Sequence, residues 1–236
     1  LMNSLRSPWL GAFAVAFFAH LALLAAEATP WDTVTKCLLA PLLIGWVLQQ
    51  GGPRIIALAL VFCFFGDLFL DLGEAWFLLG MAAFAGAHVC FITFFVRQGA
   101  LTGLKQRPWI GVVMALIAVG VLAWAWSGLE SGLRVPVAVY ALLLSTTAAT
   151  ALAVDFRAGI GGLFFLFSDA VIALGIAGRV NDGAVTSLTI MSTYGLALFF
   201  LATATVELAA KPARFDPTKA TDCWPTSETG PGKMST

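Results

Sequence analysis

The stretch Val61-Phe-Cys-Phe-Phe-Gly-Asp-Leu-Phe-Leu70 is almost entirely apolar, yet it contains the carboxylate of Asp67. The stretch Leu163-Phe-Phe-Leu-Phe-Ser-Asp-Ala-Val-Ile172 has the same character around Asp169. Burying a carboxylate in the hydrocarbon layer of a membrane costs roughly 2.5–3.5 kcal/mol, so an intramembrane acid usually faces a polar cavity. The two stretches therefore predict membrane helices, and the two aspartates are the leading candidates for functional residues of an enzyme or a carrier.

The composition of the whole chain indicates a membrane protein. Of its 236 residues, 60% are hydrophobic and only 11% are charged, and the mean hydropathy is +0.92. These values predict an all-α, polytopic membrane protein and argue against a soluble fold. The formal net charge is zero, so the chain lacks the basic character of a nucleic-acid-binding protein. We expect its partner to be a lipid or a lipid-soluble molecule.

The spacing of charged residues, glycines and prolines divides the chain into about eight segments of membrane-spanning length. These segments are residues 9–26, 35–48, 55–72, 76–96, 109–127, 135–154, 160–177 and 187–206. We expect a single transmembrane domain over residues 1–206 and a disordered tail over residues 207–236, which is rich in polar residues. The first segment has an alternative interpretation as a cleaved signal, because Arg6 precedes an apolar run that ends in small residues.

The distribution of lysine and arginine predicts the orientation in the membrane. Most of these residues fall on the side of the predicted bundle that carries both termini: Arg6, Arg54, Arg97, Lys105, Arg107, Arg157, Lys211, Arg214 and Lys219. The rule therefore predicts that both termini lie in the cytoplasm, and we expect the membrane to be a bacterial inner membrane. The third and seventh segments then run in the same direction. At about 1.5 Å per residue, Asp67 lies roughly 18 Å and Asp169 roughly 14 Å from the start of its segment, so the two carboxylates are expected at similar depth.

The cysteines and histidines do not form a recognisable metal motif. Cys37, Cys63, Cys90 and Cys223 include no C-x-x-C pair, which argues against a disulfide framework and a thiolate zinc site. We expect the first three to be packing residues. The chain has only two histidines, too few for a three-histidine zinc site, although a mixed site of histidine and aspartate stays open. We predict neither a metal nor another cofactor.

Several other polar residues within the apolar segments have two interpretations each. His88 either serves an aspartate as hydrogen-bond donor or proton shuttle, or bonds to a backbone carbonyl between helices. Lys36 and Arg134, near segment ends, either bind a phosphate or extend their charged groups to the membrane interface. Tyr140 can likewise be interpreted as a residue of the aromatic belt at that interface. Tyr194 is expected to be a packing residue. Thr146, Thr147 and Thr150 are expected to bond to carbonyls of their own helix.

Four short motifs together resemble a known family. Phe65-Gly-Asp67, the run Gly80 to His88, Arg134-Val-Pro-Val-Ala-Val-Tyr140, and Gly162-Leu-Phe-Phe-Leu-Phe-Ser168-Asp169 occur in the order and spacing of the lysoplasmalogenase-like membrane proteins, the YhhN family. The resemblance covers roughly residues 36–194. It implies hydrolysis of the vinyl ether bond of lysoplasmalogens, which releases a fatty aldehyde and glycerophosphoethanolamine or glycerophosphocholine. It also implies that Asp67 and Asp169 are catalytic, with Lys36, His88, Arg134, Tyr140 and Ser168 in supporting or substrate-binding roles.

The chemistry of a vinyl ether fits a pair of aspartates. The bond is cleaved by protonation of its β-carbon, which produces an oxocarbenium ion that water attacks, so the reaction needs a protonated acid and an ionised base. A different class of function would also use two membrane-embedded acids, namely proton-coupled transport of a small molecule or lipid. An intramembrane aspartyl protease fits less well because the Gly-x-Gly-Asp motif is absent. An inactive lipid-binding scaffold is a further alternative.

Overall fold

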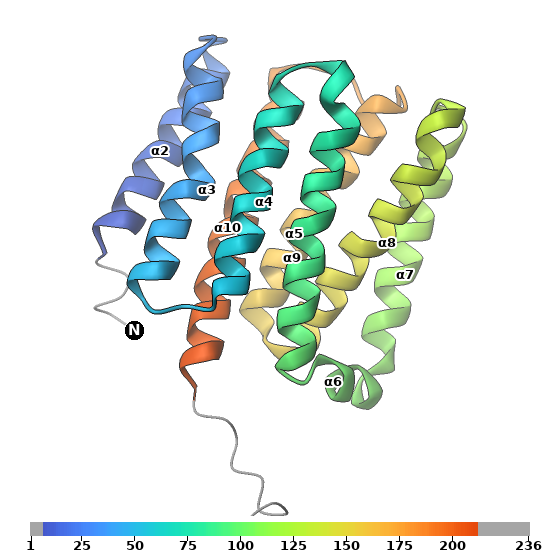
Figure 1. Ribbon diagram of the computed structural model, residues 1–236. Helices are drawn as coiled ribbons and strands as arrows, with labels where there is room; N and C mark the ends of the chain where they lie inside the picture. Colours follow the sequence, from blue (N-terminus) through green and yellow to red (C-terminus); the bar gives the residue numbers. More distant parts are fainter. Residues whose placement is uncertain (1–6, 212–236) are drawn as a thin grey trace, which may run out of the picture.

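The computed structural model describes residues 7–211, and the regular elements in this part of the chain are helices (Figure 1). The long helices are α2 (Pro8–Ala25), α3 (Trp31–Gln49), α4 (Arg54–Asp71), α5 (Phe77–Arg97), α7 (Pro108–Trp126), α8 (Ser131–Val154), α9 (Phe156–Ile176) and α10 (Ala184–Ala210). Two short helices lie before and after α5: η1 (Glu74–Trp76), a 3₁₀ helix, and α6 (Ala100–Gln106).

Each of the eight predicted spans corresponds to one long helix. Between residues 7 and 211, seven helical segments are long and apolar enough to cross a membrane. The remaining long helix, α4, has 18 residues and a mostly apolar sequence, but it also carries Arg54, Asp67 and Asp71. The chain is therefore an all-α, polytopic membrane protein, which confirms the prediction from composition.

The structure differs from the predicted spans mainly at the helix ends. α3 begins at Trp31 rather than at residue 35, and Asp32 lies in its first turn, where the helix dipole favours a negative charge. α10 continues through Ala210 and so includes the beginning of the predicted tail. Glu207 in this last turn accepts two hydrogen bonds from Arg157 Nη1, at 2.7 and 2.8 Å. Residues 212–236 of the predicted tail lie outside the described residues, as do Arg6 and Cys223.

The interior of the bundle is surrounded by α4, α5, α8, α9 and α10. α4 packs against α5, α5 against α8, α8 against α9, and α9 against α10, which contacts α4 again. α2 and α3 form a pair beside α4 and α10, and α7 lies next to α8 at the other edge of the bundle (Figure 1). α4 and α9, which carry the two aspartates, are thus separated by α5 and α8 on one side and by α10 on the other.

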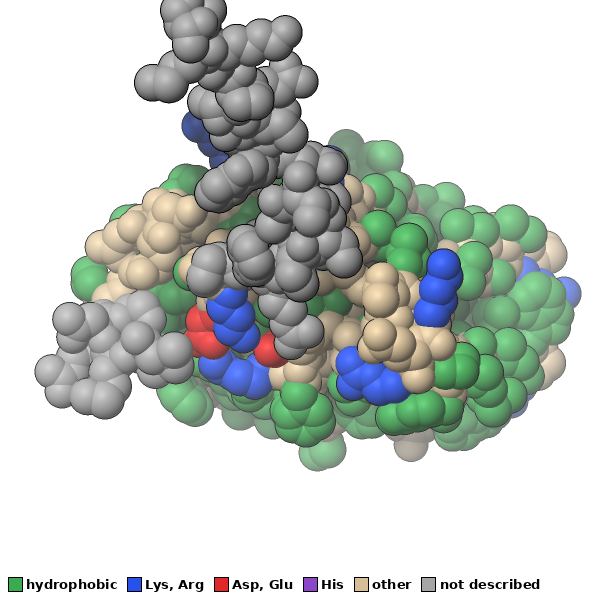
Figure 2. Space-filling view, turned by 90° about the horizontal axis from the view of Figure 1, so that it is seen from below, with side chains coloured by type: hydrophobic (Ala, Val, Ile, Leu, Met, Phe, Trp, Pro, Cys, Tyr) green, Lys and Arg blue, Asp and Glu red, His purple; other side chains and the backbone are tan. Residues whose placement is uncertain are grey.

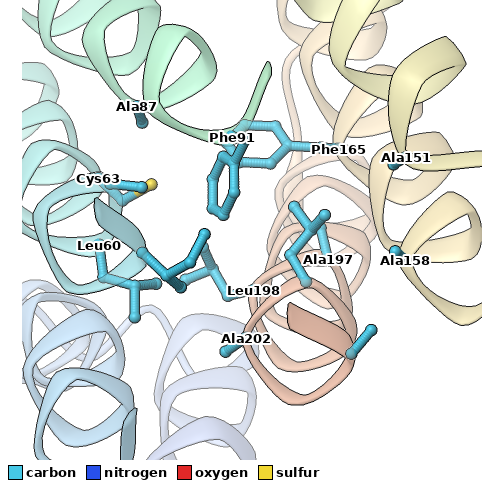
Figure 3. Packing of buried hydrophobic residues seen from close by; sticks show 14 of the residues in the cluster. Leu60, Cys63, Ala87, Phe91, Ala151, Ala158, Phe165, Ala197, Leu198 and Ala202 are labelled. Atoms are coloured by element: carbon cyan, nitrogen blue, oxygen red, sulfur yellow. The ribbon is translucent and has the colours of Figure 1, made fainter. Parts of the chain in front are cut away.

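The core between these helices consists largely of alanine, leucine and phenylalanine side chains. Phe91 of α5 and Phe165 of α9 are completely buried, as is Leu198 of α10. Figure 3 shows these groups together with side chains of α4 that point into the same region. Cys63 and Cys90 are free thiols buried in this cluster, which confirms their predicted packing role. Cys37 is also free and is half-buried.

Both ends of the described chain lie at the same end of the bundle (Figure 1). Figure 2 looks onto this end and shows lysine and arginine side chains gathered there. The helix directions assign to it Arg54 at the start of α4, Arg97 at the end of α5 and Arg157 at the start of α9. The structure thus has the basic end that the sequence predicts. The assignment of this end to the cytoplasm stays a prediction of the positive-inside rule.

Two adjacent glycines allow α9 to approach both of its neighbours closely. A Cβ atom on Gly161 would lie 2.9 Å from the backbone nitrogen of Leu201 in α10, and one on Gly162 would lie 2.8 Å from Cα of Ala148 in α8. Small residues commonly permit such backbone approach between membrane helices. We expect Gly162→Ala to destabilise the protein by about 1–3 kcal/mol, because the added methyl group meets backbone. Thermal unfolding of the purified protein in detergent measures this effect.

Gly111→Ala in α7 is the matched control, since a Cβ atom at this position has no neighbour within 4 Å. Alanine is the better helix former by about 1 kcal/mol, so this variant should be at least as stable as the wild type. If Gly162→Ala proved as stable as Gly111→Ala, the close contact between α8 and α9 would not limit stability.

Candidate active site

One pocket inside the bundle is lined by side chains from six helices, and we call it the central pocket. Its lining residues are Lys36 from α3, Asp67 and Leu70 from α4, Phe77, Met81 and Phe84 from α5, Val137 and Tyr140 from α8, Ser168, Asp169, Ile172, Ala173 and Ile176 from α9, and Ile190, Met191 and Tyr194 from α10. The cavity has a volume of about 110 Å³. The mostly apolar lining suits a hydrocarbon chain.

Asp67 is held in this pocket by a tyrosine from α10. Only 2% of Asp67 is exposed, and Tyr194 donates its phenolic proton to Asp67 Oδ2 at 2.7 Å. On its other side, Gly66 leaves room for the ring of Phe84, which would lie 2.6 Å from a Cβ atom at that position. A buried carboxyl group needs a hydrogen-bond partner. Tyr194 supplies this partner and orients the carboxyl group.

Asp169 is held by a second tyrosine, from α8. Tyr140 donates a hydrogen bond to Asp169 Oδ2, and Tyr140 Oη also lies 3.3 Å from His88 Nε2. The other ring nitrogen of His88, Nδ1, lies 3.1 Å from Thr147 Oγ1. His88 is completely buried and is absent from the pocket lining. It therefore contacts Asp169 only through Tyr140, and its partners are side chains rather than a backbone carbonyl.

Both carboxyl groups thus line one pocket although α4 and α9 do not pack together. The predicted similar depth of the two aspartates in the membrane is consistent with this arrangement. Similar depth alone does not determine whether the two side chains face the same pocket. The central pocket lies between the two helices, and each aspartate reaches it from a different side. Each has its own tyrosine, Tyr194 for Asp67 and Tyr140 for Asp169.

Lys36 and Ser168 also line the central pocket. Lys36 Nζ lies 2.6 Å from Asp71 Oδ1, in an ion pair whose side chains are 14% and 21% exposed. Asp71 lies one helical turn beyond Asp67 on α4, so the ammonium group adds positive charge near that end of the pocket. Ser168 donates its hydroxyl proton to the carbonyl of Ile190 at 3.1 Å. This bond connects α9 to α10 and occupies the hydroxyl proton of Ser168.

Arg134 does not line the central pocket. Its Nε donates to the carbonyl of Leu129 at 3.2 Å, and its guanidinium carbon lies 5.6 Å from the ring centroid of Trp126. The first contact fixes the connection between α7 and α8, and the second is a cation–π interaction. The predicted role of Arg134 in phosphate binding is therefore not supported by its position.

Tyr194 is a site residue that the sequence does not predict. The sequence favours a packing role, but the Tyr194 hydroxyl bonds to Asp67 and the residue lines the central pocket. The available signal was its phenol in a long apolar helix, because a buried tyrosine hydroxyl usually finds a partner. The prediction for the threonines is confirmed, since Thr146, Thr147 and Thr150 all donate to carbonyls of their own helix.

The arrangement is suited to acid–base chemistry on an apolar substrate. Two carboxyl groups in one low-dielectric pocket can hold a proton and a negative charge at the same time. Within residues 7–211, no group of three or more His, Cys, Asp or Glu side chains is placed to hold a metal ion. The pocket residues that carry acidic or hydroxyl protons are the two aspartates, the two tyrosines, Lys36 and Ser168.

Comparisons with known proteins give a consistent result. A model of the YhhN family matches residues 31–205. A rat protein named lysoplasmalogenase TMEM86B is 32% identical over 172 residues, which cover 70% of each chain. Its human counterpart of the same name is 31% identical over 193 residues, 79% of this chain and 81% of the relative. A Mycobacterium tuberculosis protein named lysoplasmalogenase is 36% identical over 110 residues, 42% of this chain and 40% of the relative. No solved structure gives a significant match.

Proposed function

Because the chain belongs to the YhhN family, we propose that it is a lysoplasmalogenase, an integral membrane hydrolase that cleaves the vinyl ether bond of lysoplasmalogens. Its relatives that carry this name support the reaction. The observation that carries the proposal is that Asp67 and Asp169 line one apolar pocket within the membrane-spanning bundle. The relatives carry the names of hydrolases. This supports a hydrolase over the proton-coupled carrier that the sequence also allowed.

The reaction adds one water molecule across the vinyl ether. A proton is transferred to the β-carbon, the carbon–carbon double bond becomes a single bond, and the α-carbon and ether oxygen share the positive charge of an oxocarbenium ion. Water attacks the α-carbon and loses a proton. In the resulting hemiacetal, the hydroxyl group loses its proton and the glycerol oxygen takes a proton as its bond to the α-carbon breaks, which gives a fatty aldehyde and a free glycerol hydroxyl. The step sequence needs one group that gives a proton and one that takes a proton.

We assign the proton-donating role to Asp169 and the ionised role to Asp67. Lys36 lines the pocket and pairs with Asp71, one turn from Asp67 on the same helix, so its charge stabilises a negative charge on that side. The ionised carboxylate of Asp67 stabilises the oxocarbenium ion and takes a proton from the attacking water. Tyr194 and Tyr140 position the two carboxyl groups. The apolar side chains of the pocket hold the fatty chain and limit the access of bulk water.

The direct test is aldehyde release from a lysoplasmalogen by the purified protein in detergent. The matched control substrate is the saturated ether lysolipid, which has no double bond to protonate. We expect aldehyde from the vinyl ether and none from the saturated ether. Folded protein that releases no aldehyde would contradict the proposal. Reconstituted protein that moves the lysolipid across a vesicle membrane without cleaving it would instead support the carrier.

A further inference from the structure

A second cavity adjoins the central pocket, and we call it the vestibule. Lys36, Ile172, Ile190 and Met191 line both spaces. Unlike the central pocket, the vestibule has many polar lining residues: His20, Asp32, Thr33, Lys36, Asp71 and Ser187. They come from α2, α3, α4 and α10, which brings the first two helices of the described chain into the site. A ligand whose apolar part occupies the central pocket can therefore extend a polar part into the vestibule.

Two residues that line the vestibule each have a buried polar atom without a hydrogen-bond partner, namely His20 Nε2 and Asp32 Oδ1. They are the buried side-chain atoms of this kind in the described part of the chain. His20 itself is only 2% exposed. Since buried polar atoms in proteins are nearly always paired, such atoms in a cavity call for a ligand or an ordered water molecule.

The surroundings of His20 show what kind of partner its free nitrogen needs. His20 Nδ1 lies 2.9 Å from the backbone carbonyl of Asp32, and a carbonyl oxygen can only accept. Nδ1 must therefore carry a proton. In a neutral imidazole, Nε2 is then an acceptor. Asp32 Oδ1, as a carboxylate oxygen, is an acceptor too, so both unpaired atoms need a donor.

A primary ammonium group has the matching chemistry, because it offers three N–H donors and carries a positive charge. A trimethylammonium group has the same charge but offers no N–H donor. A phosphate next to the ammonium would lie near Lys36, whose Nζ bonds to Asp71 Oδ1 and lines both spaces. Phosphate and primary ammonium together describe an ethanolamine phospholipid headgroup.

We propose that the vestibule is a headgroup site that selects ethanolamine over choline lysolipids, with the ammonium group bound by His20 Nε2 and Asp32 Oδ1 and the phosphate bound by Lys36. The proposal rests on the proposed function for the placement of the fatty chain in the central pocket. It adds a specificity that depends on hydrogen bonds rather than on charge alone. A site built to hydrogen-bond a substrate group rejects an analogue that lacks it more strongly than an apolar pocket rejects a size difference.

The first test measures binding without turnover. Saturated ether lysolipids with an ethanolamine or a choline headgroup are titrated into the purified protein in detergent. We expect the wild type to bind the ethanolamine lipid at least about tenfold more tightly. Asp32→Asn, which keeps the size of the side chain but removes its charge, should lose most of this ratio by weakening ethanolamine binding. Its affinity for the choline lipid should fall less, because that headgroup loses the attraction of the charge but no N–H hydrogen bond, and thermal unfolding reports that the variant is folded.

The matched control is Asp182→Asn, which removes an exposed carboxylate from the connection between α9 and α10 and should keep the wild-type ratio. Equal affinities of the wild type for the two lipids would overturn the proposal, and so would an Asp32→Asn protein that keeps the preference. A second test compares aldehyde release from the two vinyl ether lysolipids. Cleavage of both with equal kcat/KM would overturn the headgroup site while leaving the hydrolase in place. Absence of cleavage with a retained binding preference would overturn the hydrolase alone.

Discussion

Asp169→Asn is expected to lower aldehyde release from a lysoplasmalogen by about 100- to 10,000-fold, the usual contribution of positioned proton transfer. Asparagine keeps the shape of the side chain but has no carboxyl proton to give to the β-carbon. Asp67→Asn is expected to cause a loss of similar size, because the oxocarbenium ion loses its negative partner and water loses its base. Both rates are measured on purified protein at saturating substrate. Thermal unfolding verifies that each variant is folded.

The two variants also distinguish the roles of the aspartates. The infrared spectrum of the wild type should contain the carbonyl stretch of a protonated carboxylic acid that belongs to Asp169. This band should persist in Asp67→Asn and disappear in Asp169→Asn. The reverse pattern would exchange the two roles. Asp182→Asn, in an exposed connection, is the control for loss of a carboxylate and should keep both the rate and the band.

Removing either tyrosine hydroxyl is expected to cause the next largest loss. Tyr194→Phe deletes the hydrogen bond to Asp67, and Tyr140→Phe deletes the bond to Asp169 together with the contact to His88. The bond from Tyr194 to the ionised Asp67 should contribute about 1.5–3 kcal/mol, which corresponds to a roughly 10- to 100-fold change in rate. The bond from Tyr140 to the protonated Asp169 joins neutral groups and should contribute about 0.5–1.5 kcal/mol, a roughly 2- to 10-fold change. We expect this loss in kcat, with little change in KM, because the phenols act on the carboxyl groups. The measurement is steady-state aldehyde release.

Thr93→Val is the matched control for loss of a hydroxyl. Thr93 donates to the carbonyl of Val89 within α5, far from any contact with either aspartate, so this variant should keep wild-type kinetics. Wild-type activity in Tyr194→Phe would show that its bond to Asp67 does not contribute to catalysis. A loss confined to KM in Tyr140→Phe would instead place that hydroxyl in substrate binding.

Some of the fold follows directly from local sequence. A membrane-spanning helix needs a sufficient length of apolar residues, and this length can be read from each segment independently. All eight predicted spans correspond to helices for this reason. Their ends are less predictable, because polar residues such as Asp32 and Glu207 are compatible with a helix when a dipole or a partner stabilises them.

The candidate site was only partly predictable for a related reason. Asp67 and Asp169 are conspicuous in sequence, since a carboxylate in an apolar run has a high energetic cost. Tyr194 is not, because a tyrosine in a membrane helix has ordinary roles in packing and at the interface. For Arg134 the sequence suggests more than the structure supports. Its place in a motif suggests phosphate binding, whereas its contacts are with Leu129 and Trp126.

The all-α membrane architecture and the two aspartates within apolar segments follow from the sequence, because hydropathy and the cost of burying charge are properties of each segment. Which side chains meet depends on the tertiary structure. Apolar helices have no strong pattern that specifies which face contacts which neighbour, so the pairing of Tyr194 with Asp67 and of Tyr140 with Asp169 depends on the packing of α10 and α8. The placement of His20 and Asp32 beside one vestibule likewise depends on the packing of α2 and α3 next to α10.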